Sequence, residues 1–213
     1  MRFADRREAG VLLGRAVAER NPVDPLVAAL PRGGVPIGFE VSRVLGCELD
    51  VLVVRKVGVP FQTELAMGAV GEKGVVVRNR EVMRAARITE AVFETVVAAE
   101  TMELETRVGI YRDAADPIDP AGKTVIITDD GLATGSTALA AVDVARASGA
   151  LEVWVAVPVA AADSITRVEA AADQVVVLHR PQRFMAVGAW YRDFSQTSNA
   201  EVSDLLRRSR EDG

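Results

Sequence analysis

The stretch VIITDDGLATGST, residues 125–137, decides the fold class of this chain. It begins with branched apolar residues typical of a buried strand, continues with the adjacent acids Asp129 and Asp130, and ends in a hydroxyl-rich turn that opens a helix. Such a turn offers converging backbone N–H groups and the positive end of a helix dipole to a phosphate. The two acids can accept hydrogen bonds from vicinal ribose hydroxyls. The alternative, that the acids only cap the turn, explains less of the order of strand, acid pair and turn.

The rest of the chain repeats the alternation of short apolar runs and helical segments that is typical of a parallel sheet covered on both faces. We expect an α/β fold with a doubly wound, mainly parallel sheet of five to six strands flanked by helices. The expected strands are 26–30, 50–54, 69–77 with a turn at Gly71, 124–128, 152–157 and 174–178. The expected helices are 6–19, 35–45, 89–112, 136–147 and 160–171, with Gly46 and Gly149 as C-terminal caps.

The composition changes after residue 178, which suggests a core of residues 1–178 and a C-terminal hood or interface segment of residues 179–213. Aromatic residues make up only 5% of the chain, yet Trp190, Tyr191 and Phe194 gather in this segment. They form either a hood over a planar acceptor or a small core or dimer contact, so a homodimer stays open. His179 is more readily structural than catalytic.

A second motif, LPRGGVPIG at residues 30–38, follows the first strand and opens a helix. Its glycines Gly33 and Gly34 allow a backbone to approach an anion closely, and Arg32 adds a donor that stays charged. The motif predicts a second anion site, although by itself it also fits a sharp turn with an exposed arginine.

Cationic residues follow the second expected strand in the stretch VRKVG, residues 54–58. Open α/β sheets bind ligands at the carboxyl ends of their strands, so either cation could reach a bound anion. Lys56 is preferred over Arg55, and simple surface neutralisation is the alternative for both. Glu64 and the glutamates of the 89–112 helix are expected to be surface residues.

Composition excludes several classes of protein and site. The formal net charge of −5 argues against a nucleic-acid binder, and no apolar stretch reaches the roughly 20 residues of a membrane span. One cysteine, Cys47, and one histidine leave too few ligands for a structural zinc site. The amino terminus lacks the apolar core of a secretory signal, and we expect a cytoplasmic protein.

The stretch 125–137 resembles the signature of type I phosphoribosyltransferases, and the similarity extends over residues 26–178. The resemblance implies that Asp129 and Asp130 hold the ribose hydroxyls of 5-phosphoribosyl-1-pyrophosphate and help to place Mg²⁺, in part through ligand and water. It also implies that Ala133, Thr134, Gly135, Ser136 and Thr137 hold the 5-phosphate. Gly131 and Ala133 depart from the usual pattern, without the loss of a backbone donor.

The motif at residues 30–38 resembles the pyrophosphate loop of the same family, which often contains a non-proline cis peptide. The implied reaction transfers the phosphoribosyl group to a nitrogenous acceptor, such as a nucleobase, and releases pyrophosphate. Arg32, Lys56 and the amides of Gly33 and Gly34 would stabilise the charge on pyrophosphate. A mobile loop would lie within residues 58–87. The alternative is a regulator that binds a ribose phosphate or nucleotide without turnover; a hydrolase lacks an evident nucleophile with an adjacent base.

Overall fold

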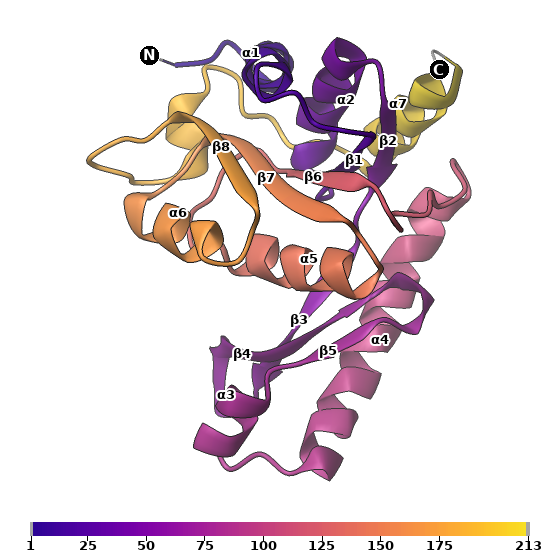
Figure 1. Ribbon diagram of the computed structural model, residues 1–213, viewed down its shortest axis with the longest axis vertical. Helices are drawn as coiled ribbons and strands as arrows, with labels where there is room; N and C mark the ends of the chain where they lie inside the picture. Colours follow the sequence, from indigo (N-terminus) through magenta and orange to yellow (C-terminus); the bar gives the residue numbers. More distant parts are fainter. Residues whose placement is uncertain (1, 212–213) are drawn as a thin grey trace.

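A five-stranded parallel sheet forms the centre of the protein in the computed structural model, which describes residues 2–211. Its strand order is β2-β1-β6-β7-β8 (Figure 1). These strands are β2 (Glu48–Val51), β1 (Pro25–Ala29), β6 (Thr124–Thr128), β7 (Glu152–Val159) and β8 (Gln174–His179). Every residue of β6 is buried, as expected of a central strand covered on both faces. The expected doubly wound architecture is confirmed.

Helices cover both faces of this sheet (Figure 1). On one face α1 (Arg6–Ala18) packs on α2 (Gly34–Leu45), and α7 (Asn199–Glu211) lies against α2 at the β2 edge. On the other face lie α5 (Ser136–Ala147) and α6 (Ala162–Glu169). From β1 the chain passes to β2, which lies on one side of β1 in the sheet, and it later returns to β6 on the other side. The connections to the two neighbours of β1 therefore run in opposite directions along the sheet. The crevice between the carboxyl ends of β1 and β6 is therefore the switch point where open α/β sheets bind ligands.

A second, antiparallel sheet was not predicted from the sequence. Its order is β3-β4-β5, with strands β3 (Val54–Val59), β4 (Gln62–Gly71) and β5 (Val76–Arg78), and η1 (Glu72–Gly74) joins the last two. Figure 1 shows this sheet beneath α5, with α3 (Arg80–Ala85) and the 23-residue α4 (Glu90–Arg112) beside it. The expected strand 50–54 is thus divided between the two sheets. The segment 58–87, in which we expected a mobile loop, contains the β3–β4 hairpin tip, β5 and α3, and its mobility stays a prediction.

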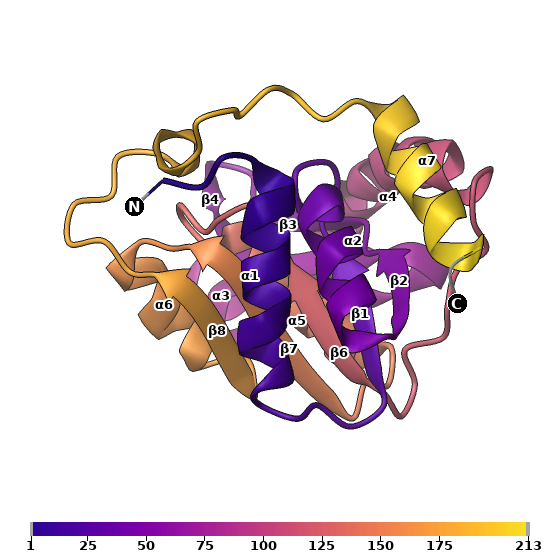
Figure 2. The same cartoon turned by 90° about the horizontal axis from the view of Figure 1, so that it is seen from above.

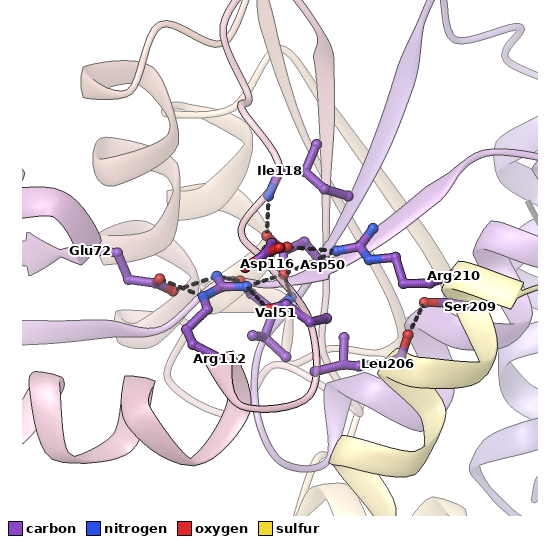
Figure 3. A network of polar contacts seen from close by, with 10 residues as sticks. Asp50, Val51, Glu72, Arg112, Asp116, Ile118, Leu206, Ser209 and Arg210 are labelled. Atoms are coloured by element: carbon purple, nitrogen blue, oxygen red, sulfur yellow. Dashed lines mark hydrogen bonds and ion pairs between the residues drawn. The ribbon is translucent and has the colours of Figure 1, made fainter.

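An ion-pair network fastens the antiparallel sheet and α4 to the parallel sheet (Figure 3). The guanidinium of Arg112 contacts both carboxylate oxygens of Glu72 at 2.8 Å and Asp50 Oδ1 at 2.6 Å. Asp50 also accepts hydrogen bonds from the amides of Val51 and Ile118, at 2.7 and 2.9 Å. Because each charge has several partners, the burial of these groups is compensated, and the position of α4 is fixed.

The C-terminal segment crosses the molecule from β8 to α7 (Figure 2). After η2 (Val187–Trp190) it runs beside the amino terminus, where Tyr191 forms a parallel bridge to Phe3. The amide of Phe3 donates to the carbonyl of Trp190, and the amide of Arg192 donates to the carbonyl of Phe3, both at 2.8 Å. The start of α1 is thereby held against residues 190–193. The division of the chain at residue 178 stays a prediction.

Most other expected elements are present with small shifts of their ends. The expected β6 and α5 match the observed bounds, and Thr89 caps α4 by accepting a hydrogen bond from the amide of Val92. Gly46 caps α2 with φ 63°, whereas α5 is capped by Ser148 and followed by Gly149. The expected helix 160–171 is shorter in the structure.

Candidate functional site

Two loops that follow β1 and β6 lie side by side at the switch point. The last residues of these strands, Ala29 and Thr128, are in register, and the amide of Leu30 donates to the carbonyl of Thr128 at 2.9 Å. The first loop carries Arg32, Gly33 and Gly34, and the second carries the acid pair and the hydroxyl-rich turn. Sheet pairing therefore brings together the two motifs that the sequence separates by about a hundred residues.

Gly33 lies against the carboxyl group of Asp130. A Cβ atom placed on Gly33 would stand 2.7 Å from Asp130 Cγ, a distance that real Cβ atoms do not reach. Only glycine allows the first loop to approach the acid pair this closely. The peptide bond between Pro31 and Arg32 in this loop is cis, as the resemblance to the pyrophosphate loop led us to expect.

The hydroxyl-rich turn at residues 133–137 is open on its outer side. Gly135 begins α5 with φ 72°, a conformation that favours glycine. The hydroxyls of Thr134 and Ser136 contact each other at 3.1 Å. Within residues 2–211, the amides of Thr134, Gly135 and Thr137 donate to no protein acceptor. These free donors at a helix N-terminus suit a phosphate group.

Contacts behind the turn hold it in place. The hydroxyl of Ser164 donates to the carbonyl of Ala133 at 2.5 Å, and the side chain of Arg167 donates to the carbonyl of Thr134. Both residues belong to α6, which begins after the neighbouring strand β7. The turn is thus supported from the side opposite its free amides.

Asp129 and Asp130 are half-buried, and burial is the largest cause of the shifts in their pKa values. Burial, followed by the charge of Asp130, raises the pKa of Asp129 to about 8. Burial also raises the pKa of Asp130, while the guanidinium of Arg6 opposes this shift. Asp129 Oδ1 accepts a hydrogen bond from the amide of Asp130 at 2.8 Å. At neutral pH the pair therefore carries less than two negative charges in the absence of a ligand.

Arg6 is a residue of the site that the sequence analysis missed. Its Nε and Nη2 atoms donate to the same oxygen of Asp130, Oδ2, at 3.1 and 2.8 Å. Its Nη1 atom donates to the carbonyl of Ser195 at 2.8 Å, and its guanidinium lies 4.0 Å from the ring centroid of Phe194. Arg6 and Asp130 are 124 positions apart, so no local pattern could have indicated this contact.

Two cavities meet at Arg32, which lines both. The larger, of about 790 Å³, lies between the carboxyl ends of β1 and β2, the β3–β4 hairpin and α4. The smaller, of about 310 Å³, is lined by Arg6, Arg32, Gly33, Asp130, Phe194, Gln196 and Thr197. A ligand that fills both cavities would pass Arg32.

The two cations of β3 line the larger cavity, and each has an acidic partner. Arg55 contacts Glu100 of α4 at 2.6 Å, and Lys56 contacts Glu64 at 3.3 Å. Glu64 is exposed, as expected, but Glu100 is half-buried at the cavity wall and not on a solvated helix face. The expected preference for Lys56 over Arg55 is not resolved by position, because both side chains reach the cavity.

The C-terminal aromatic residues divide between core and cavity. Tyr191 is buried, and its hydroxyl donates to the carbonyl of Asp130 at 2.6 Å. Phe194 is partly exposed and lines the smaller cavity, as a hood residue would. His179 packs against Trp190, with ring centroids 4.8 Å apart and ring planes tilted by 59°, and lines neither cavity.

The residues present suit a magnesium ion that is held mainly by its ligand. Among residues 2–211, no three His, Cys, Asp or Glu side chains gather into a metal cage. Mg²⁺ commonly binds through one or two carboxylates together with substrate phosphates and water. The pair Asp129 and Asp130 beside two expected phosphate sites meets that requirement.

Among residues 2–211, no helix is long and apolar enough to cross a bilayer.

Comparisons with known proteins agree with this geometry. Residues 12–185 match the family model of the phosphoribosyl transferase domain. A Mycobacterium tuberculosis protein, described provisionally as a phosphoribosyl transferase, is 47% identical over 210 residues. The match covers 99% of this chain and 47% of that relative, so the chain spans about half the length of the curated relatives it matches.

A solved structure shares nearly the whole fold. The Thermus thermophilus protein TT1426 superposes with a TM-score of 0.94 at 42% sequence identity, covering 98% of this chain and 99% of that one. The resemblance seen in the sequence motifs is thereby confirmed at the level of family and fold. The chain belongs to the phosphoribosyl transferase domain family.

Proposed function

We propose that this protein is a Mg²⁺-dependent phosphoribosyltransferase that takes 5-phosphoribosyl-1-pyrophosphate as donor and a nitrogenous acceptor, such as a nucleobase. One observation carries the proposal: two loops suited to anions lie side by side at the switch point, with Asp129 and Asp130 between them. The donor has the same order of groups, since its ribose separates a 5-phosphate from a pyrophosphate. The family membership supports the reaction type.

Each group of the donor has a complementary part of the site. The free amides of the turn at residues 133–137 would bind the 5-phosphate. Asp129 and Asp130 would accept hydrogen bonds from the ribose hydroxyls; Asp130 Oδ1 has no protein partner within residues 2–211. Arg32 and Lys56, which line the larger cavity, would face the pyrophosphate. When bound, Mg²⁺ would neutralise charge on the pyrophosphate oxygens.

In the proposed reaction the lone pair of an acceptor nitrogen forms a bond to the anomeric carbon. The carbon–oxygen bond to pyrophosphate breaks, its electron pair leaves with the pyrophosphate oxygen, and the nitrogen loses a proton to solvent. The protein stabilises the leaving charge through Arg32 and Lys56 and holds the ribose in line. This mechanism demands little proton transfer from side chains, in agreement with the single histidine of the chain.

The acceptor would enter from the smaller cavity, because that cavity opens beside Asp130 on the side away from the hairpin cations. Phe194 would offer an aromatic face to a planar acceptor. A homodimer and a cytoplasmic location stay predictions.

Calorimetric titration with phosphoribosyl pyrophosphate and Mg²⁺ tests the proposal. We expect saturable binding by the wild type, which an Asp129→Asn, Asp130→Asn double variant loses. Asp163→Asn, a charge removal on the exposed surface of α6, is the matched control and should bind as the wild type does. Absence of binding by the wild type at millimolar donor would contradict the proposal and favour a sensor of another nucleotide. Release of pyrophosphate with added nucleobases then tests turnover.

A further inference from the structure

One face of α4 forms a wall of the larger cavity. Val96, Glu100, Arg107 and Tyr111 all line it, and their spacing along the chain places them on the same side of a helix. The sequence analysis assigned no chemistry to this helix. Its position is set by the network around Arg112, at the carboxyl end of α4.

The charges in this cavity do not balance. Four cations line it, and Glu100 and Glu64 pair with Arg55 and Lys56. Within residues 2–211, Arg32 and Arg107 form neither an ion pair nor a side-chain hydrogen bond with the protein. Two guanidinium groups therefore face a shared cavity without an anionic partner. Arg107 is exposed and Arg32 is half-buried, so the cavity that they line presents positive charge that attracts an anion.

Tyr111 follows Arg107 by one turn of α4 and lines the same cavity as Arg32. Its side chain is 4% exposed, yet the residue lines the cavity. Burial raises the pKa of Tyr111, and the charges of Arg32 and Arg107 oppose that shift. The hydroxyl of Tyr111 lies 3.3 Å from Asn199 Oδ1, which orients the amide nitrogen of Asn199 away from the tyrosine.

We propose that Arg107, Tyr111 and Asn199, together with Arg32 of the first loop, form a binding site for a phosphate group. Two guanidinium groups and the amide nitrogen of Asn199 supply the donors that phosphate oxygens require, and the Tyr111 hydroxyl holds Asn199 by donating to its Oδ1 atom. The site is built by α4, α7 and the loop after β1, and only Arg32 belongs to the motifs that the sequence analysis identified. The inference rests on the proposed function for the identity of the adjoining donor pocket.

The phosphate group could come from two sources with the same chemistry. One is the outer phosphate of the donor's pyrophosphate, which would extend from Arg32 along α4. The other is a phosphate carried by the acceptor. The larger cavity reaches from Arg32 past Arg107 to Val96, which leaves room beyond a pyrophosphate bound at the first loop.

Calorimetry with inorganic pyrophosphate and with orthophosphate tests the site without an acceptor. We expect Arg107→Ala to weaken binding of at least one of these probes about tenfold or more, and Arg107→Lys to restore part of the affinity. Tyr111→Phe should weaken it less. Arg207→Ala is the matched control, because Arg207 is exposed on α7 and unpaired within residues 2–211, and it should change nothing. Equal affinity in Arg107→Ala and wild type, or no binding of either probe by the wild type, overturns the site.

Two further titrations distinguish the sources. If the site takes the donor's outer phosphate, Arg107→Ala weakens phosphoribosyl pyrophosphate but leaves ribose 5-phosphate unchanged. If it takes a phosphate of the acceptor, Arg107→Ala leaves donor affinity unchanged and weakens orthophosphate binding to the donor-saturated protein. A different result would separate this site from the proposed function. If the wild type binds pyrophosphate, Arg107→Ala loses that binding, and the wild type does not bind phosphoribosyl pyrophosphate, the proposed function is contradicted and this site is retained.

Discussion

The guanidinium of Arg6 holds the carboxyl group of Asp130, with Nη2 2.8 Å from Oδ2. Both side chains are largely buried, at 12% and 16% exposure. A paired, buried arginine favours the ionised form of its carboxylate partner, against the effect of burial, and fixes the orientation of the carboxyl group. Oδ2 is committed to Arg6, whereas Oδ1 has no protein partner within residues 2–211.

Arg6→Ala should destabilise the protein by about 2 kcal/mol, because Asp130 would remain buried without its charged partner. Urea unfolding measures this loss, and the affinity for phosphoribosyl pyrophosphate should fall in parallel. Adding Asp130→Asn to Arg6→Ala should recover part of the stability. If the double variant is no more stable than Arg6→Ala, the stabilising role of Arg6 is not exerted through Asp130.

The raised pKa of Asp129 predicts a specific pH dependence. A carboxyl group with a folded pKa of about 8, against 3.8 in the unfolded chain, holds a proton in the folded state over the pH range between these values. The folded state then binds more protons than the unfolded state, so stability falls as pH rises toward 8 and levels off above it. Through this single group, the free energy of unfolding falls by at most about 1.4 kcal/mol for each unit by which the pH rises.

Unfolding of wild type and Asp129→Asn, measured from pH 5 to pH 9, isolates that contribution. The stability of Asp129→Asn relative to wild type should increase as pH rises through this window. A difference between the two proteins that does not vary with pH would show that Asp129 is already ionised at pH 5.

Gly33→Ala should abolish or strongly weaken donor binding while the protein remains folded. The new methyl group would overlap the carboxyl group of Asp130 and displace either the loop or the acid. Gly109→Ala is a matched control, since no atom lies within 4 Å of the added carbon on α4. That control should bind normally and be more stable by up to about 1 kcal/mol, from helix propensity. Normal donor binding by Gly33→Ala would refute the close-approach argument.

Arg112→Met should cost about 3 kcal/mol or more, because Glu72 would stay buried without a cation and Asp50 would keep only Arg210, 3.9 Å away. Removal of an exposed arginine, Arg180→Ala, breaks only the surface pair with Glu169 and should cost less than about 1 kcal/mol. Chemical unfolding compares the two variants. Similar losses for both would mean that the network in Figure 3 does not anchor α4.

Local sequence patterns predicted the parallel sheet well, because each of its strands is a short apolar run next to a periodic helix. The stretch from β6 to α5 was predicted to the residue, since the acid pair and the glycine turn mark its internal boundaries. The antiparallel sheet was missed because β4 begins with the exposed, polar residues 62–64 and its pairing depends on contacts with α4 and α5. An apolar run broken by charges gives no periodic signal for such a strand.

The candidate site shows the same division between local and distant information. Arg32, Gly33 and the acid pair lie in motifs with a direct physical purpose, so the sequence indicated them. Arg6 enters through a contact between residues 124 positions apart, and Arg107 through the packing of a helix whose polar residues resemble a solvated face. Neither feature can be predicted from the residues that neighbour Arg6 or Arg107 in the sequence.

The bridge between Phe3 and Tyr191 joins nearly opposite ends of the described chain beside Asp130. During synthesis the parallel sheet can form once residue 179 has emerged, but Arg6 lacks its partner Ser195 and its stacking ring Phe194 until later. The contacts that position Arg6 beside Asp130 are therefore completed after the sheet that supports them, and a nascent chain stopped before residue 190 would carry both loops without these contacts.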